Sequence, residues 1–443
     1  MSKSQPDSSP PFEWLWGPAP WDDAEECIYL PKPDGLFDTA AYTIPKGRIP
    51  TWSLPKSYIP DAALNPLYQP VYRRAGEQPI SALDLFCGAG GASAGMHMAG
   101  YEVVAGVDQD RDALQSYNES LPGKPVHHDL RDVDISALPR DGYHVVHISP
   151  PCQGFSQARG ELNLDAEENE MVWVALEWLQ ALRPPLVTME NVVGMSQIDT
   201  AFMDELTAAF DSVGFDMRWK VINSADYGVP QERRRIICIG LRHDLRSPGI
   251  DWFPTESHSN TAMRSLVGDP VEAYQTASDA IGDLPSSPRT TADDPTLECP
   301  TIEGYPLADE KSPLHNDDAE ALSTQRRVAN HIAPDHDPEV KRRHTRIPRG
   351  ETVGSVTECR LAPNEPARTI CGSKGTSIVH YEGDDSARRL TVRETARLQG
   401  FPDTHVFVGS RQSQYQQVAN AVPPQLMAEI ACHIPKLLCL QTD

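Results

Sequence analysis

The feature that most constrains this fold is a regular alternation of short apolar runs and helix-forming segments from residue 80 onward. The apolar runs have strand length and occupy 82–86, 102–107, 143–148, 185–189 and 217–223, with helical composition at 91–98, 110–117, 171–182 and 202–213. Repeated strand–helix units predict a parallel sheet covered by helices on both faces. A further run at 235–241 follows a turn, and we expect it to join antiparallel. The predicted fold class is α/β, with a doubly wound sheet.

Composition divides the rest of the chain into segments of different character. Residues 1–78 are rich in proline and tryptophan and show no sustained helix or strand period. We expect them to form an N-terminal extension, whose function the sequence does not indicate. Residues 79–244 carry the alternation and form the expected catalytic domain. Residues 245–410 are too long for a loop within a compact domain, which predicts a second, smaller and irregular domain. Residues 411–443 include an apolar helical stretch that is expected to return to the first domain.

Cysteine usage and hydropathy exclude several classes of protein. The 443 residues include nine scattered cysteines without a Cys-x-x-Cys pair, so we expect no disulfide framework and no metal site. No apolar run reaches the roughly 18 residues of a membrane span, and the first residues lack an apolar signal core. These features predict a cytoplasmic protein without a membrane partner.

The charge balance is strongly acidic. Lysine and arginine number 39 against 63 aspartates and glutamates, which gives a net charge of −24. Such a protein repels polyanions unless its acidity lies away from the binding surface. The alternative is a halophilic host, since molar salt shortens the screening length to roughly 3 Å and acidic surfaces stay soluble. The halophilic interpretation is favoured.

Two strand ends carry candidate catalytic groups. Cys152 follows Pro150 and Pro151 on the turn after the run 143–148, and Glu190 with Asn191 ends the run 185–189. The carboxyl ends of parallel strands are where ligands collect in such sheets. A thiolate at Cys152 is suited to attack an electron-poor carbon, and Glu190 is suited to protonate or hydrogen-bond a ring nitrogen. Asn191 is expected to hold the loop geometry.

A basic strand offers partners for the thiolate. An ordinary cysteine, with a pKa of about 8.5, is only a few per cent thiolate at neutral pH. Arg233 and Arg235 are two residues apart on the last strand, so both side chains are expected to reach one site. Nearby histidines are tempting bases, but nothing pairs them with the cysteine, and we expect structural roles for His127, His128, His144 and His147.

A glycine-rich turn after the first strand predicts a cofactor loop. The turn lets the backbone approach a ligand closely, and the residues expected to line it are Phe86, Gly88, Gly90 and Gly91. Asp108 ends the second strand, where a carboxylate is suited to accept hydrogen bonds from ribose hydroxyls. Asp129 is a candidate for an adenine amino group. The spacing lacks the full dinucleotide pattern and a Walker lysine, which favours a nucleoside without a pyrophosphate.

Taken in order, these motifs resemble the DNA cytosine-5 methyltransferases. The resemblance covers about 80–241 and 366–438, and later motifs include Arg-Leu-Thr-Val-Arg-Glu at 389–394 and Asn-Ala-Val-Pro-Pro at 420–424. It implies a Rossmann-like methyltransferase domain with S-adenosylmethionine as cofactor. The segment inserted before the C-terminal helix would be the target-recognition domain. One departure is Ala419, where the family usually has glycine.

The resemblance also implies roles for single residues. Cys152 would attack C6 of a flipped-out cytosine in double-stranded DNA, Glu190 would contact N3, and Arg233 and Arg235 would orient cysteine, base and phosphate. Pro151 and Asn420 would help complete the cofactor pocket. We expect a monomer, with a cognate restriction endonuclease as a possible companion. A tRNA cytosine-5 methyltransferase and a non-catalytic DNA-binding relative remain as alternatives.

The densest basic run lies in the variable segment, at 341–346 followed by Arg349. A local basic cluster is unexpected in so acidic a protein. We expect it to face DNA, with Arg342 or Arg343 on phosphate or on a guanine edge.

Overall fold

The structure is a computed structural model of the whole chain. It describes residues 79–132, 142–151, 167–195, 200–245, 251–260, 272–284, 329–334, 336–353, 358–371, 377–383 and 387–439, together with strands β1 (Glu26–Tyr29) and β2 (Thr43–Lys46), which pair antiparallel. The expectations for the remainder of the 1–78 extension lie outside the described residues.

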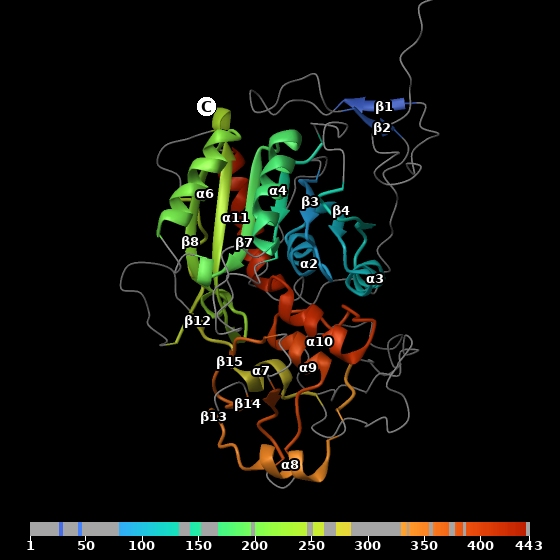
Figure 1. Ribbon diagram of the computed structural model, residues 1–443, viewed down its shortest axis with the longest axis vertical. Helices are drawn as coiled ribbons and strands as arrows, with labels where there is room; N and C mark the ends of the chain where they lie inside the picture. Colours follow the sequence, from blue (N-terminus) through green and yellow to red (C-terminus); the bar gives the residue numbers. More distant parts are fainter. Residues whose placement is uncertain are drawn as a thin grey trace, which may run out of the picture.

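A seven-stranded sheet forms the upper part of the molecule (Figure 1), with the strand order β5-β4-β3-β6-β7-β10-β8. Its strands are β3 (Ser81–Leu85), β4 (Glu102–Asp108), β5 (Lys124–His127), β6 (Val145–Ile148), β7 (Leu186–Val192), β8 (Phe215–Asn223) and β10 (Arg234–Arg242). The order reverses between β3 and β6, which is the position where open α/β sheets bind ligands. The expected α/β class with a Rossmann-like sheet is confirmed.

Strand β10 is the one strand of this sheet that runs against its neighbours. It pairs antiparallel with both β7 and β8, with Ile237 opposite Glu190 on one side and Lys220 on the other. Its buried residues alternate between the two faces of the sheet, as Cys238 packs on one face and Ile239 on the other. The expected antiparallel strand at 235–241 is therefore confirmed. The short strand β5 at the sheet edge was not expected.

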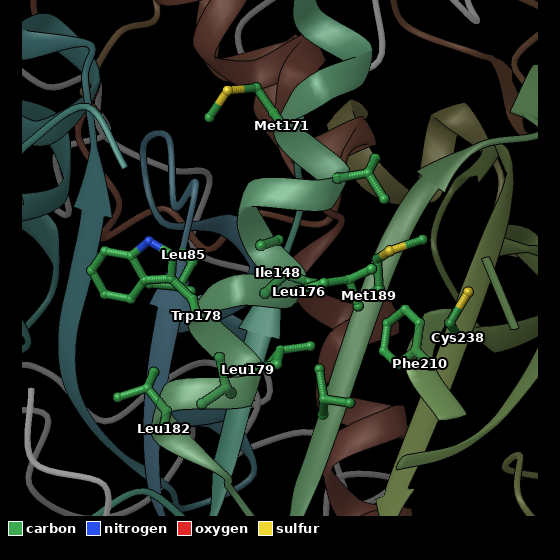
Figure 2. Close-up of a cluster of buried hydrophobic side chains, with 14 of the residues drawn as sticks. Leu85, Ile148, Met171, Leu176, Trp178, Leu179, Leu182, Met189, Phe210 and Cys238 are labelled. Atoms are coloured by element: carbon green, nitrogen blue, oxygen red, sulfur yellow. The ribbon is translucent and has the colours of Figure 1, made fainter. Parts of the chain in front are cut away.

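Helices cover both faces of the sheet because each has an apolar side. Helices α4 (Glu167–Leu182) and α6 (Thr200–Ser212) pack on one face, where Trp178, Leu179 and Phe210 meet Met189 of β7 (Figure 2). On the opposite face lie α2 (Gly91–Met98) and α11 (Pro424–Cys439), with α3 (Arg111–Ser120) beside α2. No helix in the described part of the chain is long and apolar enough to span a membrane.

A second group of elements lies below the sheet in Figure 1, and we call it the lower region. Its elements are α7 (Ala277–Ile281), α8 (Pro338–Thr345), β13 (Thr352–Val353), β14 (Glu358–Arg360), β15 (Ala367–Arg368), β16 (Ser377–Val379), α9 (Val392–Leu398) and α10 (Arg411–Asn420). Strand β15 pairs in parallel with β9 (Gln231–Glu232), which leads into the main sheet. Two further strands, β11 (His258–Ser259) and β12 (Glu272–Ala273), form a separate parallel pair.

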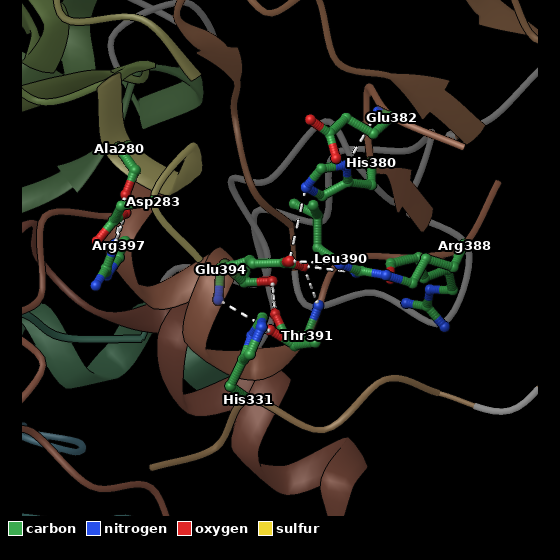
Figure 3. A network of polar contacts seen from close by, with 12 residues as sticks. Ala280, Asp283, His331, His380, Glu382, Arg388, Leu390, Thr391, Glu394 and Arg397 are labelled. Atoms are coloured by element: carbon green, nitrogen blue, oxygen red, sulfur yellow. Dashed lines mark hydrogen bonds and ion pairs between the residues drawn. The ribbon is translucent and has the colours of Figure 1, made fainter. Parts of the chain in front are cut away.

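A buried carboxylate organises the lower region (Figure 3). Glu394 is fully buried, and Arg388 donates to both of its oxygens at 2.8 and 2.6 Å. Glu394 also accepts a hydrogen bond from the Thr391 amide, as the Thr391 side chain caps α9 in return. The pattern at 389–394 therefore has a structural role: it begins α9 and ties it to the preceding strand.

The chain returns to the sheet at its C-terminal end. Helix α11 packs along α2, and the Tyr101 hydroxyl donates to the Ala431 carbonyl at 2.9 Å. Helix α10, in contrast, packs against both α9 and α3. The return to the sheet expected of residues 411–443 is therefore made by α11, while α10 belongs with the lower region as much as with the sheet.

Candidate functional site

Four parallel strands end at the same edge of the sheet, and the turns after them carry most of the candidate residues. Phe86 follows β3, Asp108 ends β4, Pro150 follows β6 and Glu190 lies near the end of β7. Neighbouring register pairs link these ends directly, as Leu85 pairs with Val107 and with Ile148. The sheet therefore brings the expected cofactor loop and the expected catalytic turns to one edge.

The glycine loop after β3 has a tight, left-handed path. Phe86, Gly88 and Gly90 all have positive φ angles, of 62°, 53° and 89°. A side chain at Gly90 would place its Cβ 2.3 Å from Leu121 Cδ1, whereas nothing lies within 4 Å of a Cβ built at Gly88. Gly90 therefore permits close packing on α3, and Gly88 borders open space. The geometry at Gly88 suits the close approach of a ligand.

Asp108 is held beside this loop by two main-chain groups. The amide of Gly88 donates to Oδ2 and the amide of Asp110 donates to Oδ1, both at 2.8 Å. Burial raises the pKa of Asp108 above its ordinary value, and these hydrogen bonds oppose the shift. A carboxylate has about four lone-pair positions, so each oxygen keeps acceptor capacity for a hydroxyl group. The Asp108 carboxylate can therefore accept hydrogen bonds from the hydroxyl groups of a ribose.

Asp129 has a different environment from the one expected. Arg131 binds its carboxylate through Nε at 3.1 Å and Nη2 at 2.7 Å, and the same hydrogen bonds lower the pKa of Asp129. The carboxylate is thus engaged by an arginine two residues away. Contact with an adenine amino group would have to share the oxygens with Arg131.

Asp84 is a buried group of this region that the sequence did not single out. Its Oδ2 accepts hydrogen bonds from the amide and hydroxyl of Ser93, at 3.1 and 2.6 Å. No described group bonds its Oδ1, and burial raises the pKa of Asp84 to about 7. The contact joins β3 to α2 across the cofactor loop. The sequence feature that could have identified Asp84 is its position as a charged residue inside an otherwise apolar strand.

The turn expected to carry the nucleophile is anchored just before that residue. Pro150 is buried and Pro151 is half-buried, and Asn191 Nδ2 donates to the Pro150 carbonyl at 3.4 Å. Asn191 Oδ1 accepts from the Val192 amide at 2.8 Å, which fixes the side chain. Asn191 thus contacts the turn that it is expected to hold. Cys152 itself lies outside the described residues.

Glu190 forms an ion pair with Arg235 across β7 and β10. Arg235 Nε lies 3.0 Å from Glu190 Oε1, and the two side chains are only 12% and 9% exposed. The contact is electrostatic, because among the described groups none makes a hydrogen bond of good geometry to Oε1. The arrangement brings together two of the expected catalytic side chains.

Arg233 has partners of another kind. Its guanidinium donates to the carbonyls of Ile370, Ala419 and Ala421, at 3.2, 2.9 and 3.2 Å. The residue is 2% exposed. The buried guanidinium thus binds main-chain carbonyls of the lower region. The expectation that Arg233 and Arg235 orient cysteine, base and phosphate stays a prediction. Strand alternation alone could not reveal these partners.

Asn420, His144 and His147 each have a side-chain partner. Asn420 is exposed at the end of α10, and its Oδ1 accepts from Gln416 Nε2 at 2.6 Å. His147 is buried against Thr188, and burial lowers the pKa of His147 to about 3 and that of His144 to about 4. Burial therefore disfavours the charged form of both rings. Among the described residues, no cluster of three or more histidine, cysteine or acidic side chains could hold a metal ion.

Most of the basic run of the variable segment lies in helix α8, which ends at Thr345, and the members of the run have different environments. Arg343 binds Glu358 through two nitrogens, at 2.9 and 2.5 Å, and His344 is buried. Arg342 and Arg346 are exposed. The run is therefore not a uniform cationic surface, and the expected DNA contact fits Arg342 better than Arg343.

Sequence comparisons show which family the chain matches. Residues 80–436 match the family model of C-5 cytosine-specific DNA methylases. The chain is 29% identical over 392 residues to the type II methyltransferase M.DdeI of Desulfomicrobium norvegicum, covering 80% of this chain and 88% of that protein. It is 30% identical over 396 residues to M.XorII of Xanthomonas oryzae, covering 82% and 85%.

A solved structure supports the fold. A prophage-encoded DNA modification methyltransferase of E. coli superposes with a TM-score of 0.61 at 24% identity, covering 81% of this chain and 99% of that one. The family match spans the sheet, the edge that carries Asp108 and Glu190, the lower region and most of α11. The chain therefore belongs to the C-5 cytosine-specific DNA methylase family.

Proposed function

We propose that this protein transfers a methyl group from S-adenosylmethionine to C5 of cytosine within a specific sequence of double-stranded DNA. The observation that carries the proposal is the buried Glu190–Arg235 pair beside the anchored Pro150 turn. A buried carboxylate and a buried guanidinium at the end of the strands form a polar site for a planar, hydrogen-bonding substrate. The names of the relatives M.DdeI and M.XorII support the same activity.

The proposed chemistry begins at Cys152. Its thiolate adds to C6 of cytosine, and the electron pair of the C5–C6 bond then makes C5 nucleophilic. Glu190 donates a hydrogen bond or proton at N3, which stabilises the charge that develops on the ring. Arg235, whose Nε lies 3.0 Å from Glu190 Oε1, orients the carboxyl group and pairs with the carboxylate that is left when the proton moves to N3. After methyl transfer, the C5 proton passes to water, the N3 proton returns to Glu190 and the thiolate is expelled from C6, which restores the aromatic ring, with S-adenosylhomocysteine as the second product.

The target carbon lies within the base stack of a duplex. The cytosine must therefore leave the stack before Cys152 can reach C6, so base flipping is part of the proposal. The part of the lower region from α7 to α9 is the proposed target-recognition domain, within the expected limits of 245–410. Its exposed basic residue Arg342 is a candidate for DNA contact.

The cofactor would bind at the glycine loop. Asp108 would accept the ribose hydroxyls, and the backbone at Gly88 would approach the ligand, where the structure leaves open space. When bound, the cofactor supplies an electrophilic methyl group on a sulfonium. Further proposed members of the pocket are Phe86, Gly90, Gly91, Asp129, Pro151 and Asn420. Type II names among the relatives also support a partner restriction endonuclease.

Methyl transfer tests this proposal directly. Purified protein with tritiated S-adenosylmethionine should label unmethylated plasmid DNA and not tRNA, and Cys152→Ser should abolish labelling while DNA binding persists. Cys432→Ser, at a half-buried position on α11, is the matched control. Labelling of tRNA alone would favour the RNA enzyme. Labelling of neither, with DNA binding retained, would favour a non-catalytic relative.

A further inference from the structure

Three buried polar side chains lie where the main sheet meets the lower region. Gln231 and Gln399 are fully buried and Arg233 is 2% exposed. Gln231 and Arg233 belong to the segment that enters β10, and Gln399 follows α9. Burying a polar group costs free energy unless the group is hydrogen-bonded. The partners of these three side chains therefore show which segments they hold together.

Gln231 binds two separate parts of the lower region. Its Oε1 accepts from the Ile370 amide at 2.9 Å, just after β15. Its Nε2 donates to the Leu398 carbonyl at 3.1 Å and to Gln399 Oε1 at 2.6 Å, at the end of α9. The Gln231 side chain of β9 thus binds both the segment after β15 and the end of α9.

The segment between α10 and α11 receives hydrogen bonds from two of these side chains. Gln399 Nε2 donates to the Ala421 carbonyl at 2.7 Å, and Arg233 Nη2 donates to the same carbonyl at 3.2 Å. Arg233 also reaches the Ala419 and Ile370 carbonyls. The planar guanidinium therefore holds 419–421 and the end of β15 in one fixed arrangement.

The same segment presses against the cofactor loop. A Cβ at Gly91 would lie 2.3 Å from the Val422 carbonyl oxygen and 2.9 Å from Ala421 Cβ, so the two backbones are in close contact. Arg233, which binds the Ala421 carbonyl, is also two residues before Arg235, and Arg235 pairs with Glu190. A continuous set of contacts runs from the start of α2, through Ala421 and Arg233, to the strand that bears Arg235.

We infer that Arg233 is a positioning residue, supported by Gln231 and Gln399, that holds the 419–422 segment against the cofactor loop and fixes β10 relative to Glu190. This role differs from contact with cysteine, base or phosphate. It rests on the proposed function for the identity of the cofactor. Lysine cannot reproduce the role, because its single ammonium lacks the fork that reaches three carbonyls.

The test compares cofactor affinity in substituted proteins. Arg233→Lys should raise the dissociation constant of S-adenosylhomocysteine, measured by calorimetry without DNA, by about tenfold, since hydrogen bonds to a charged group are lost. It should also raise the KM for S-adenosylmethionine and lower kcat on unmethylated plasmid DNA. Gln399→Met should shift the dissociation constant in the same direction by a smaller factor. Arg218→Lys, on the exposed part of β8, is the matched control and should change neither quantity.

The outcomes separate this role from a stabilising one and from the proposed function. Lower melting temperatures with an unchanged dissociation constant in both variants would overturn the inference. If Arg233→Lys does not fold, Gln399→Met decides in the same way. Wild-type protein that binds S-adenosylhomocysteine but labels no nucleic acid would contradict the proposed function, while the comparison of dissociation constants still decides the role of Arg233. Wild-type protein that does not bind S-adenosylhomocysteine would overturn both.

Discussion

Arg235 Nε lies 3.0 Å from Glu190 Oε1, and the pair joins the end of β7 to the start of β10 in a nearly buried position. The antiparallel pairing of these strands creates the contact, because Arg235 faces Val192 and so comes within reach of Glu190 two residues earlier. Removing one member of a buried ion pair leaves the other uncompensated. The pair therefore has consequences for both activity and stability.

We expect Glu190→Gln to lower kcat for methyl transfer by about 10²–10⁴, because a neutral amide cannot act as an acid at N3. The assay is initial-rate labelling of unmethylated plasmid DNA. Glu177→Gln, at an exposed position of α4, serves as the control and should retain wild-type turnover. Near wild-type kcat in the Glu190 variant would remove this residue from the chemistry.

Asp108→Ala should weaken S-adenosylhomocysteine binding by at least about tenfold, since each hydrogen bond to a charged group contributes roughly 1.5–3 kcal/mol. Calorimetry measures the dissociation constant, with Asp204→Ala on the exposed side of α6 as the control. Thermal melting checks that the loop anchored by the Gly88 amide has not collapsed. A folded variant with unchanged affinity would place the ribose elsewhere.

Asp84 should make stability depend on pH. Burial raises its pKa in the folded protein to about 7 from an ordinary value of 3.8. Below pH 3.8 the carboxyl is protonated in both states, and its contribution to the free energy of unfolding is fully present. That contribution is lost progressively as pH rises to about 7, because the unfolded chain releases the proton while the folded state keeps it. Asp84→Asn should therefore lose less stability than wild type between pH 5 and pH 8. Urea titrations at both pH values measure the free energy of unfolding. An equal decrease in the variant and the wild type would contradict this expectation.

The acidity of the chain predicts an unusual response to salt. With a net charge of −24, repulsion should loosen the fold at low ionic strength, and molar salt should screen it. An ordinary DNA-binding enzyme loses affinity steeply with salt. Under the halophilic hypothesis, methyl transfer should instead rise toward molar KCl. Best activity near 0.1 M, with a stable fold there, would refute the hypothesis.

Arg342 and Arg343 should behave differently although they are neighbours on α8. Arg342→Ala should weaken binding to plasmid DNA and reduce the salt slope of log K by about 1, if its exposed side chain meets one phosphate. Arg343→Ala should affect DNA binding less, because its guanidinium is held by Glu358. Gel-shift titrations at several salt concentrations compare the two. Equal effects would show that Glu358 does not hold Arg343 when DNA binds.

The parallel sheet, and the edge of it that carries the candidate site residues, could be predicted from local sequence pattern. Short apolar runs separated by helical segments allow few arrangements other than a parallel sheet, and the ends of its strands then share one edge. Asp108 and Glu190 could be singled out because each directly follows or ends such a run. The antiparallel strand β10 could be expected as well, since a turn at 227–230 reverses the chain before it.

The partners of the polar side chains could not be predicted from the sequence and are known from the folded structure. Arg233 and Arg235 look alike in the sequence, yet one binds carbonyls of residues 137 to 188 positions away and the other binds Glu190. Local pattern fixes which face of a strand a residue lies on, because side chains alternate with a period of two. It cannot fix what lies opposite that face, because segments distant in the chain supply those groups and meet only when the chain folds.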